Sequence, residues 1–374
     1  MFDYLIIGAG ISGAAAAYEL STHGNVALVD AESRAGYHST GRSAAMYTPN
    51  YGGELIRKIC RLSHAFLDSP PADFCSQPIL RHRGMMTVAS PGQEQAMALK
   101  LAEGGSEYVA LDVDQTVVMA PFLRRQNVLG AIYEAAVASI DVDALHQGFL
   151  GGMRKRGGTL LLEHGVTGLH RRTDGWVAIL EDGQIQAKVV INAAGAWADE
   201  IGRMAGAVSI GLVPKRRTAI LVDPPEGVDL ASVPAIDFMG INSYIIPNAG
   251  QLMVSPGDES PVEPQDIQTD DMEVAVLVDW LENQTSIEVR HLNHEWAGLR
   301  SFVSDGAPVV GFDPVADDFF WLAGQGGYGI MMSSSQARAT VSLITERQLP
   351  GDFINSGIGE WEISPARIGE HEAD

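Results

Sequence analysis

Cysteine is scarce in this chain, and so is basic charge. The chain has only two cysteines, Cys60 and Cys75, too few for a disulfide framework or a cysteine metal site. We therefore expect two buried thiols in a reducing compartment and no metal centre. Basic residues number 25 against 47 acidic ones, and the resulting net charge of −22 opposes binding to phosphate backbones. Nucleic acid is thus not an expected partner.

Long apolar runs are also absent. No segment approaches the ~20 consecutive apolar residues of a membrane helix, so no membrane span is expected. The first twenty residues are apolar, but Asp3 stands where a signal peptide would be basic, and glycines interrupt the run. We expect a cytoplasmic protein. A length of 374 residues suggests about two domains.

The N-terminal segment YLIIGAGISGAAAAYELSTHGNVALVDAES has the form strand, glycine turn, helix, strand. Residues 4–7 and 25–29 are predicted strands, and residues 12–22 are a predicted helix. Gly8, Gly10 and Gly13 form the pattern G-x-G-x-x-G, and Asp30 closes the second strand. Such glycines let a backbone approach a pyrophosphate at a helix N-terminus, while the acid accepts ribose hydroxyls. A dinucleotide site is predicted, without a choice between FAD and NAD.

The middle of the chain predicts a return to the same sheet. Residues 141–156 are a predicted helix with Asp141 or Asp143 as N-cap, followed by a strand at 159–163. A three-stranded meander with turns at 174–175 and 182–183 follows, and then a buried strand at 189–192. The small residues 193–196 after that strand indicate either a close approach to a cofactor or a tight turn. Near the end, a strand, a glycine loop at 324–329 and a long helix complete this domain.

The intervening segments predict a second domain. Residues 78–89 and 213–222 are predicted strands, residues 248–250 form the turn of a hairpin, and residues 272–282 have helical spacing. The predicted fold is α/β (α+β overall), a Rossmann-like cofactor domain with an inserted antiparallel-sheet substrate domain. The cofactor domain comprises residues 1–77, 140–211 and 296–374, and the substrate domain comprises residues 78–139 and 212–295.

Several motifs together resemble a known family. GAGISG, NAAGAWAD and GQGGYGI are similar to motifs of the D-amino-acid oxidase superfamily of flavoproteins, which includes glycine and sarcosine oxidases. GYHSTGRSAA, DALHQG, PKRR and WAGLRSFV narrow the resemblance to the bacterial FAD-dependent D-arginine dehydrogenases. These motifs are spread from end to end of the chain. The resemblance implies non-covalently bound FAD lying between the two domains.

The same resemblance implies a set of cofactor-binding residues. The loop at 39–45 is expected to follow the FAD pyrophosphate and flavin, with Arg42 offsetting phosphate charge; from composition alone it would equally be a solvated polar turn. The implied cofactor residues are Gly8, Gly10, Ile11, Ser12, Gly13, Asp30, Ser39, Thr40, Arg42, Ser43, Ala44, Ala45, Val166, Ala194, Gly195, Trp197, Gly326, Gly327, Tyr328 and Gly329.

Arginine is the residue suited to capture a substrate carboxylate, because its planar guanidinium donates two parallel hydrogen bonds. The family's substrate arginines correspond to Arg217 and Arg300, although periodicity does not decide between Arg216 and Arg217. The resemblance further implies that Tyr51 and Tyr244 contact the substrate, and that the Gly327 carbonyl accepts a hydrogen bond from its amine.

Two positions depart from the D-arginine dehydrogenase pattern. Met46 replaces a histidine near the substrate, and Met85 replaces a glutamate that pairs with a cationic side chain. A thioether cannot pair with a guanidinium group, and desolvating an unpaired charge is costly. We therefore hypothesise neutral or apolar substrates rather than arginine. Another carboxylate replacing the glutamate, or a purely structural role for Met85, are the alternatives.

The predicted activity is a FAD-dependent D-amino acid dehydrogenase, which transfers a hydride from Cα to flavin N5 and yields a 2-oxo acid and ammonia after hydrolysis. No protein base is required if the amine binds unprotonated. The expected partners are an amino acid and a quinone or other electron acceptor. A glycine- or sarcosine-type amine oxidase using oxygen, a nicotinamide-dependent dehydrogenase and a non-catalytic FAD-binding protein are the alternatives.

Overall fold

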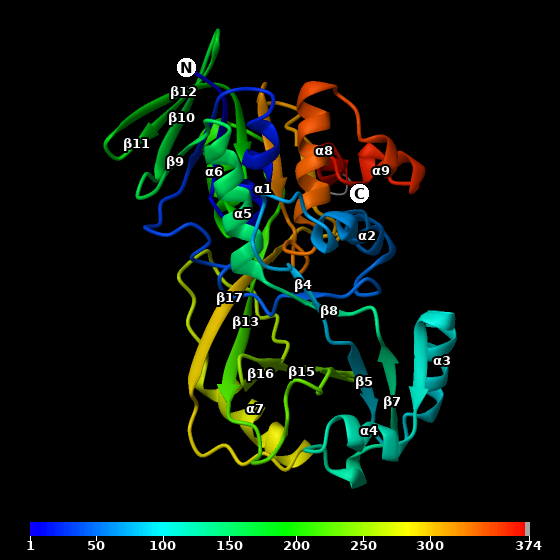
Figure 1. The fold of residues 1–374 in the computed structure, drawn as a ribbon. Coiled ribbons are helices and arrows are strands. Elements are labelled where there is room, and N and C mark those ends of the chain that lie inside the picture. Colours follow the sequence, from blue (N-terminus) through cyan, green and yellow to red (C-terminus); the bar gives the residue numbers. More distant parts are fainter. Residues whose placement is uncertain (371–374) are drawn as a thin grey trace.

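The chain folds around two large β-sheets, which lie one above the other in Figure 1. The computed structural model describes residues 1–370. The upper, first sheet has eight strands, and its central strands are parallel. Its strands are β1 (Phe2–Ile7), β2 (Val26–Val29), β9 (Thr159–Leu161), β10 (Val166–Arg172), β11 (Gly175–Leu180), β12 (Gly183–Asn192), β18 (Val309–Phe312) and β19 (Phe319–Ala323).

Helices cover one face of the first sheet, and the β10–β11 hairpin and a short helix cover the other. Small side chains at 13–17 are buried, which lets the first helix pack closely against its neighbours. The helices on the first face are α1 (Ile11–Leu20), α2 (Glu54–Asp68), α5 (Val142–Lys155), α8 (Ser333–Thr345) and α9 (Gly351–Asn355); the helix on the second face is α6 (Ala198–Ala205).

The lower, second sheet also has eight strands, in the order β17-β13-β16-β15-β14-β5-β7-β6. One of its faces packs against helices in an apolar core, and the other faces the first domain. Its strands are β5 (Met85–Ala89), β6 (Tyr108–Leu111), β7 (Gly130–Glu134), β13 (Val213–Val222), β14 (Ala235–Phe238), β15 (Ile241–Asn248), β16 (Gln251–Ser255) and β17 (His294–Phe302).

Smaller elements complete the second domain and the connection between domains. Helices α4 (Val113–Met119) and α7 (Asp271–Gln284) pack on the core side of the second sheet, and α3 (Glu94–Gly104) lies at its edge. Strands β3 (Met46–Tyr47), β4 (Leu80–His82) and β8 (Ala138–Ile140) form a small three-stranded sheet where the chain passes between domains. Within residues 1–370, no helix has the length and apolar character needed to cross a bilayer.

The predicted α/β fold with a second, sheet-based domain is confirmed. The N-terminal strand–helix–strand unit, the meander and the hairpin all form as predicted. Asp141, rather than Asp143, caps α5 by accepting from the backbone N–H of Ala144 at 2.9 Å. The predicted strand at 189–192 is the end of β12, whose first half pairs with β11 and whose second half pairs with β1.

Other predictions were wrong in detail. The strand predicted at 78–89 is broken at Gly84, where φ is +74° and a Cβ atom would lie 2.3 Å from the Tyr133 hydroxyl, so β4 and β5 belong to different sheets. The second sheet is not wholly antiparallel, because β14 and β5 run parallel. The expected domain boundary at 295/296 falls inside β17, all of which pairs with β13. Cys60 is buried, but Cys75 is only partly so.

Candidate cofactor and substrate site

The glycines of the N-terminal turn are required by close packing. Gly8 has φ +104°, and a Cβ there would lie 2.4 Å from the Ala193 carbonyl oxygen. A Cβ at Gly13 would lie 1.9 Å from the Gly8 carbonyl oxygen. Any side chain at either position would push α1 away from β1 and β12. The turn therefore brings the N-terminus of α1, with its unpaired backbone N–H groups and positive dipole end, to the edge of a cavity.

Polar side chains hold this turn in place from three directions. Asp30 accepts from the Ala9 backbone N–H at 2.6 Å, and burial raises the pKa of its carboxyl group. Thr40 accepts from the Ile11 N–H at 3.0 Å. His146, whose pKa is lowered by burial, lies with Nε2 2.9 Å from the Ala9 carbonyl oxygen. These contacts fix the position of the turn through protein groups alone.

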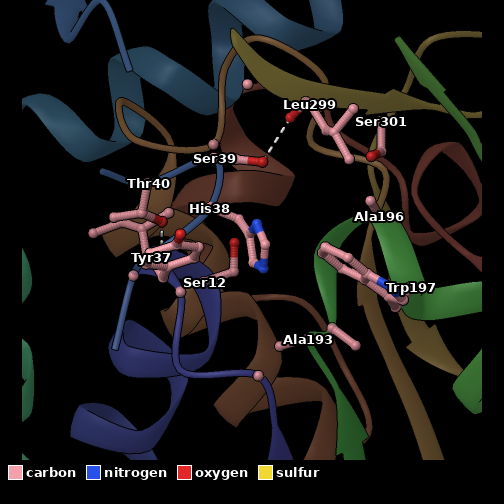
Figure 2. Close-up of a pocket in the computed structure, with 18 of the residues that line it drawn as sticks. Ser12, Tyr37, His38, Ser39, Thr40, Ala193, Ala196, Trp197, Leu299 and Ser301 are labelled. Carbon is pink, nitrogen blue, oxygen red and sulfur yellow. Dashed lines mark hydrogen bonds between the residues drawn. The ribbon is translucent and has the colours of Figure 1, made fainter. Parts of the chain in front are cut away.

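The loop after β2 is bonded to β17 of the second sheet. Ser39 donates to the Leu299 carbonyl at 2.6 Å, as Figure 2 shows, and the Trp296 indole N–H donates to the Arg42 carbonyl at 3.2 Å. The Arg42 guanidinium donates to the Ala297 carbonyl at 3.0 Å and pairs with Asp266 at 2.5 Å. Arg42 lines the cavity while it is paired with Asp266, and its expected role against phosphate charge stays a prediction.

A cavity of about 410 Å³ extends from the α1 turn to the face of the second sheet. Most of the predicted cofactor residues line it; Gly13, Ala45 and Tyr328 do not. Gly13 packs against Gly8, and the Ala45 carbonyl accepts from Ile140. Those that line the cavity are Gly8, Gly10, Ile11, Ser12, Asp30, Ser39, Thr40, Arg42, Ser43, Ala44, Val166, Ala194, Gly195, Trp197, Gly326, Gly327 and Gly329.

The predicted carboxylate-binding residues meet at one end of this cavity. Arg300 and Arg217 come from adjacent strands, and Tyr244 lines the same cavity. Arg300 lies against Gly327, where a Cβ would be 3.0 Å from the guanidinium Nη1. Arg217 donates from Nε to the Asp258 carbonyl at 2.8 Å and pairs with Glu259 at 3.0 Å. Arg217 is thus paired with Glu259, whereas Arg300 brings to the cavity a guanidinium group with no ion pair among residues 1–370.

Arg216 points to the opposite face of β13, because successive side chains alternate along a strand. Its guanidinium lies 2.9 Å from Glu273 of α7 and 3.4 Å from Asp258. Arg217 lines the cavity and Arg216 does not. The choice between the two arginines, which the sequence left open, is decided by strand alternation and by the position of α7.

The remaining predicted substrate residues lie elsewhere. Tyr51 is 48% exposed and, with Met85, lines a second cavity rather than the first. Met46 lines neither cavity and packs on an apolar cluster that also includes Met85 and Tyr244. The Tyr328 ring packs 5.5 Å from the Tyr51 ring, and burial raises its pKa to about 12.

Some lining residues were not predicted. The Gln325 amide nitrogen is buried without a hydrogen-bond partner among the described residues, although the side chain lines the cavity. An unpaired buried donor in a cavity is a site for a ligand acceptor. His38 pairs with Glu32 at 2.8 Å, and its ring lies 4.6 Å from the Trp197 ring across the cavity in Figure 2. Gln325 is the second residue of the GQGGYGI motif, so the sequence could have indicated it as a polar residue of the cofactor loop.

Comparison with known families now identifies the site. Residues 3–343 match the model of the DAO family, described as FAD dependent oxidoreductase. The chain belongs to the DAO family. Its cofactor is therefore FAD. The cavity fits this group, because its glycine cradle, the helix N-terminus and the unpaired Gln325 amide offer the close approach and the donors that a dinucleotide flavin needs.

Similar proteins within the DAO family differ in their substrates. The chain is 25% identical over 319 residues to a glycerol 3-phosphate dehydrogenase of Caloramator mitchellensis, covering 80% of this chain and 65% of that protein. It is 29% identical to human mitochondrial dimethylglycine dehydrogenase, covering 54% of this chain and 24% of that protein. Its fold is similar to that of glycine oxidase from Geobacillus kaustophilus, with a TM-score of 0.82, 21% identity and coverage of 96% and 98%. The chain thus spans 65% and 24% of the length of these two sequence relatives.

Proposed function

We propose that the protein is a FAD-dependent D-amino acid dehydrogenase. The observation that supports this most directly is Arg300, which lies against Gly327 at the cavity and, among residues 1–370, forms none of the ion pairs that engage Arg216 and Arg217. A partly buried guanidinium without a partner is costly unless an anion binds to it. An amino acid brings a carboxylate, which a guanidinium binds through two parallel hydrogen bonds.

The chain's residues would position the substrate rather than react with it. FAD, when bound, supplies the hydride acceptor, its N5 atom, for the Cα hydrogen. Arg300 and Arg217 hold the carboxylate, the Gly327 carbonyl accepts from the amine, and Tyr244 lies beside the substrate. Oxidation of the Cα–N bond gives an imino acid, and water converts it to a 2-oxo acid and ammonia. With Met46 in place of a histidine, the amine is proposed to bind unprotonated.

The side chain of the substrate is proposed to be neutral or apolar. Met46 and Met85 lie in a cluster with Ala44, Ala219 and Met253, which borders the substrate end of the cavity with carbon and sulfur atoms. A cationic side chain would lose its hydration there. The FAD is proposed to be bound non-covalently, and a quinone or similar acceptor is proposed to reoxidise it.

An alternative is an amine oxidase that acts on glycine or sarcosine and uses oxygen. The fold similarity to a glycine oxidase and the sequence similarity to a dimethylglycine dehydrogenase favour this candidate. Both of those proteins are named for a substrate with a carboxylate next to the carbon that bears nitrogen. The same two arginines would bind it.

Anaerobic reduction of the bound flavin tests the proposal. D-methionine should bleach the visible absorbance of the purified holoenzyme much faster than L-methionine, D-arginine, glycine, sarcosine or glycerol 3-phosphate. Mixing the reduced enzyme with oxygen or with a soluble quinone then identifies the acceptor. Fastest bleaching by glycine or sarcosine, with peroxide release in air, would favour the alternative. Fastest bleaching by glycerol 3-phosphate would refute both.

A further inference from the structure

A second cavity of about 840 Å³ lies next to the first, on the same face of the second sheet. Its lining includes Thr87 of β5, Lys100 of α3, Glu134 of β7 and Asp237 of β14. None of these four side chains takes part in the proposed chemistry. Met85, which has been placed beside the substrate, also lines this cavity.

The strand register makes one continuous floor under both cavities. Asp237 pairs with Tyr244 of β15 on one side and with Thr87 on the other, and Met85 pairs with Glu134. Paired residues on neighbouring strands point to the same face of a sheet. Tyr244 lines the first cavity and Asp237 lines the second. The backbones of these two residues are therefore one strand spacing apart, about 4.8 Å.

One apolar cluster contacts both cavities. Met46 and Met85 lie in one apolar cluster with Tyr244 and Met253, both of which line the first cavity. Unbranched thioether side chains adopt many rotamers at low cost. A methylene chain that starts at the first cavity can therefore pass between them along the sheet.

On the floor of the second cavity, Lys100 lies among the carboxyl groups of Asp237 and Glu134. The cavity is also lined by Arg57, Arg61, Glu103 and Glu107. Lys100 donates to the Thr87 hydroxyl at 3.3 Å and forms no ion pair within residues 1–370. Burial raises the pKa of Asp237 to about 6, an effect that the nearby Lys100 charge opposes. Glu134 accepts from the Asn50 amide at 2.9 Å, and burial raises its pKa as well.

This combination offers a ligand both a hydrogen-bond donor and hydrogen-bond acceptors. The Lys100 ammonium group can donate to a ligand oxygen, and the Asp237 and Glu134 carboxylates can accept from a ligand N–H. A carboxamide matches the set, because its oxygen accepts from an ammonium group while its NH₂ donates to carboxylates. Hydrogen bonds to ionised partners are the stronger ones, so such a match also gives selectivity over an alkyl group.

We propose that the second cavity binds the terminal carboxamide of the substrate's side chain, with Lys100 donating to the carboxamide oxygen and Asp237 accepting from its nitrogen. This inference rests on the proposed function, since the substrate's α-carboxylate must occupy the first cavity. From Cα, the side chain of glutamine spans roughly 5 Å to its amide, given C–C bonds of about 1.5 Å. That reach is close to the strand spacing that separates Tyr244 from Asp237.

Two unreactive acids test the inference without relying on oxidation. Glutaramate carries a carboxylate and a terminal carboxamide, and 5-methylhexanoate has the same shape with two methyl groups in place of the amide. Calorimetric titration of the holoenzyme should give roughly tenfold tighter binding of glutaramate, equivalent to one charge-assisted hydrogen bond. Lys100→Met and Asp237→Val should each abolish this preference. Asp279→Asn, an exposed carboxylate of α7 on the opposite side of the sheet, should retain it.

Equal affinity for the two acids in the unmodified enzyme, a preference that survives both substitutions, or no binding of either acid would overturn the inference. Kinetics separate this result from the proposed function. D-glutamine should reduce the flavin with a higher kcat/KM than D-methionine, whereas D-alanine, which is too short to reach Asp237, should be insensitive to both substitutions. A preference for glutaramate without any turnover of D-amino acids would support the carboxamide site and refute the proposed function.

Discussion

Arg216 and Arg217 are neighbours on β13, yet their replacement should have opposite consequences. The Arg216 side chain is 14% exposed and lies 2.9 Å from Glu273 and 3.4 Å from Asp258. Arg216→Met would leave these two carboxylates next to each other without the cation between them. Breaking a buried ion pair in this way costs about 3–5 kcal/mol. Because Asp258 would still accept from the backbone and side chain of Thr218, at 2.6 and 2.9 Å, we expect the lower end, about 3 kcal/mol.

This loss of unfolding free energy corresponds to a measurable fall in the melting temperature, Tm. For 374 residues, an unfolding entropy of about 2.1 cal/mol/K per residue gives about 0.8 kcal/mol/K, so Arg216→Met should lower Tm by about 4 °C. Its KM for D-methionine should stay within about twofold of the unmodified value, since Arg216 does not line the cavity. Scanning calorimetry at one fixed excess of FAD measures the Tm, because cofactor concentration itself shifts it.

Arg217→Met is the matched comparison. It removes a donor to the Asp258 carbonyl and an ion pair with the exposed Glu259, at a cost of about 1 kcal/mol, so Tm should fall by less than 2 °C. Loss of a hydrogen bond to the substrate carboxylate should raise KM roughly tenfold. The reverse pattern, in which Arg216→Met raises KM and Arg217→Met lowers Tm more, would refute the assignment of the two faces.

Three further outcomes can be measured. Arg300→Met should raise KM for D-methionine by roughly a hundredfold or more, because it removes a bidentate partner of the substrate carboxylate. The flavin content of the purified protein should stay unchanged, because the substitution removes no contact that supports the cofactor. An unchanged KM would contradict the proposed function. Gly13→Ala should yield protein largely without flavin, as judged by the ratio of visible to ultraviolet absorbance. The control Gly151→Ala in α5 should retain its flavin, because a Cβ atom there would meet nothing within 4 Å. Burial raises the pKa of Asp237 from 3.8 to about 6, so the folded protein holds a proton that the unfolded chain releases in that interval, and the free energy of unfolding falls as pH rises through it. Denaturant titrations should therefore show Asp237→Asn gaining stability relative to the unmodified protein from pH 4 to 6 and no further above that; a constant difference would refute the shift.

Local patterns in the sequence predicted the cofactor domain well. The turn of Gly8, Gly10 and Gly13, with Asp30 at the end of the next strand, is a local feature, and its geometry follows from backbone sterics within one strand–helix–strand unit. The two-residue hairpin turn at Ala249 and Gly250, both with positive φ, is equally local.

Features that depend on distant partners were not predicted. The break at Gly84 exists because the Tyr133 ring from β7 occupies the space beside it. Tyr51 was expected to contact the substrate and Met85 to border its side chain, and both line the second cavity instead of the one that holds the arginines. Asp237 and Lys100 carried no signal in the sequence, because an isolated acid and an isolated lysine normally indicate only a solvated surface.

The bonds between the loop at 36–45 and β17 have a consequence for assembly of the enzyme. Ser39, Arg42 and Trp296 join the cofactor side of the cavity to the substrate side through hydrogen bonds that cross from one sheet to the other. The loop therefore has no complete set of partners until β17 has docked. Any displacement of β17 would therefore move the loop at 36–45 together with Arg300, so the cofactor side and the substrate side of the cavity keep a fixed relation to each other.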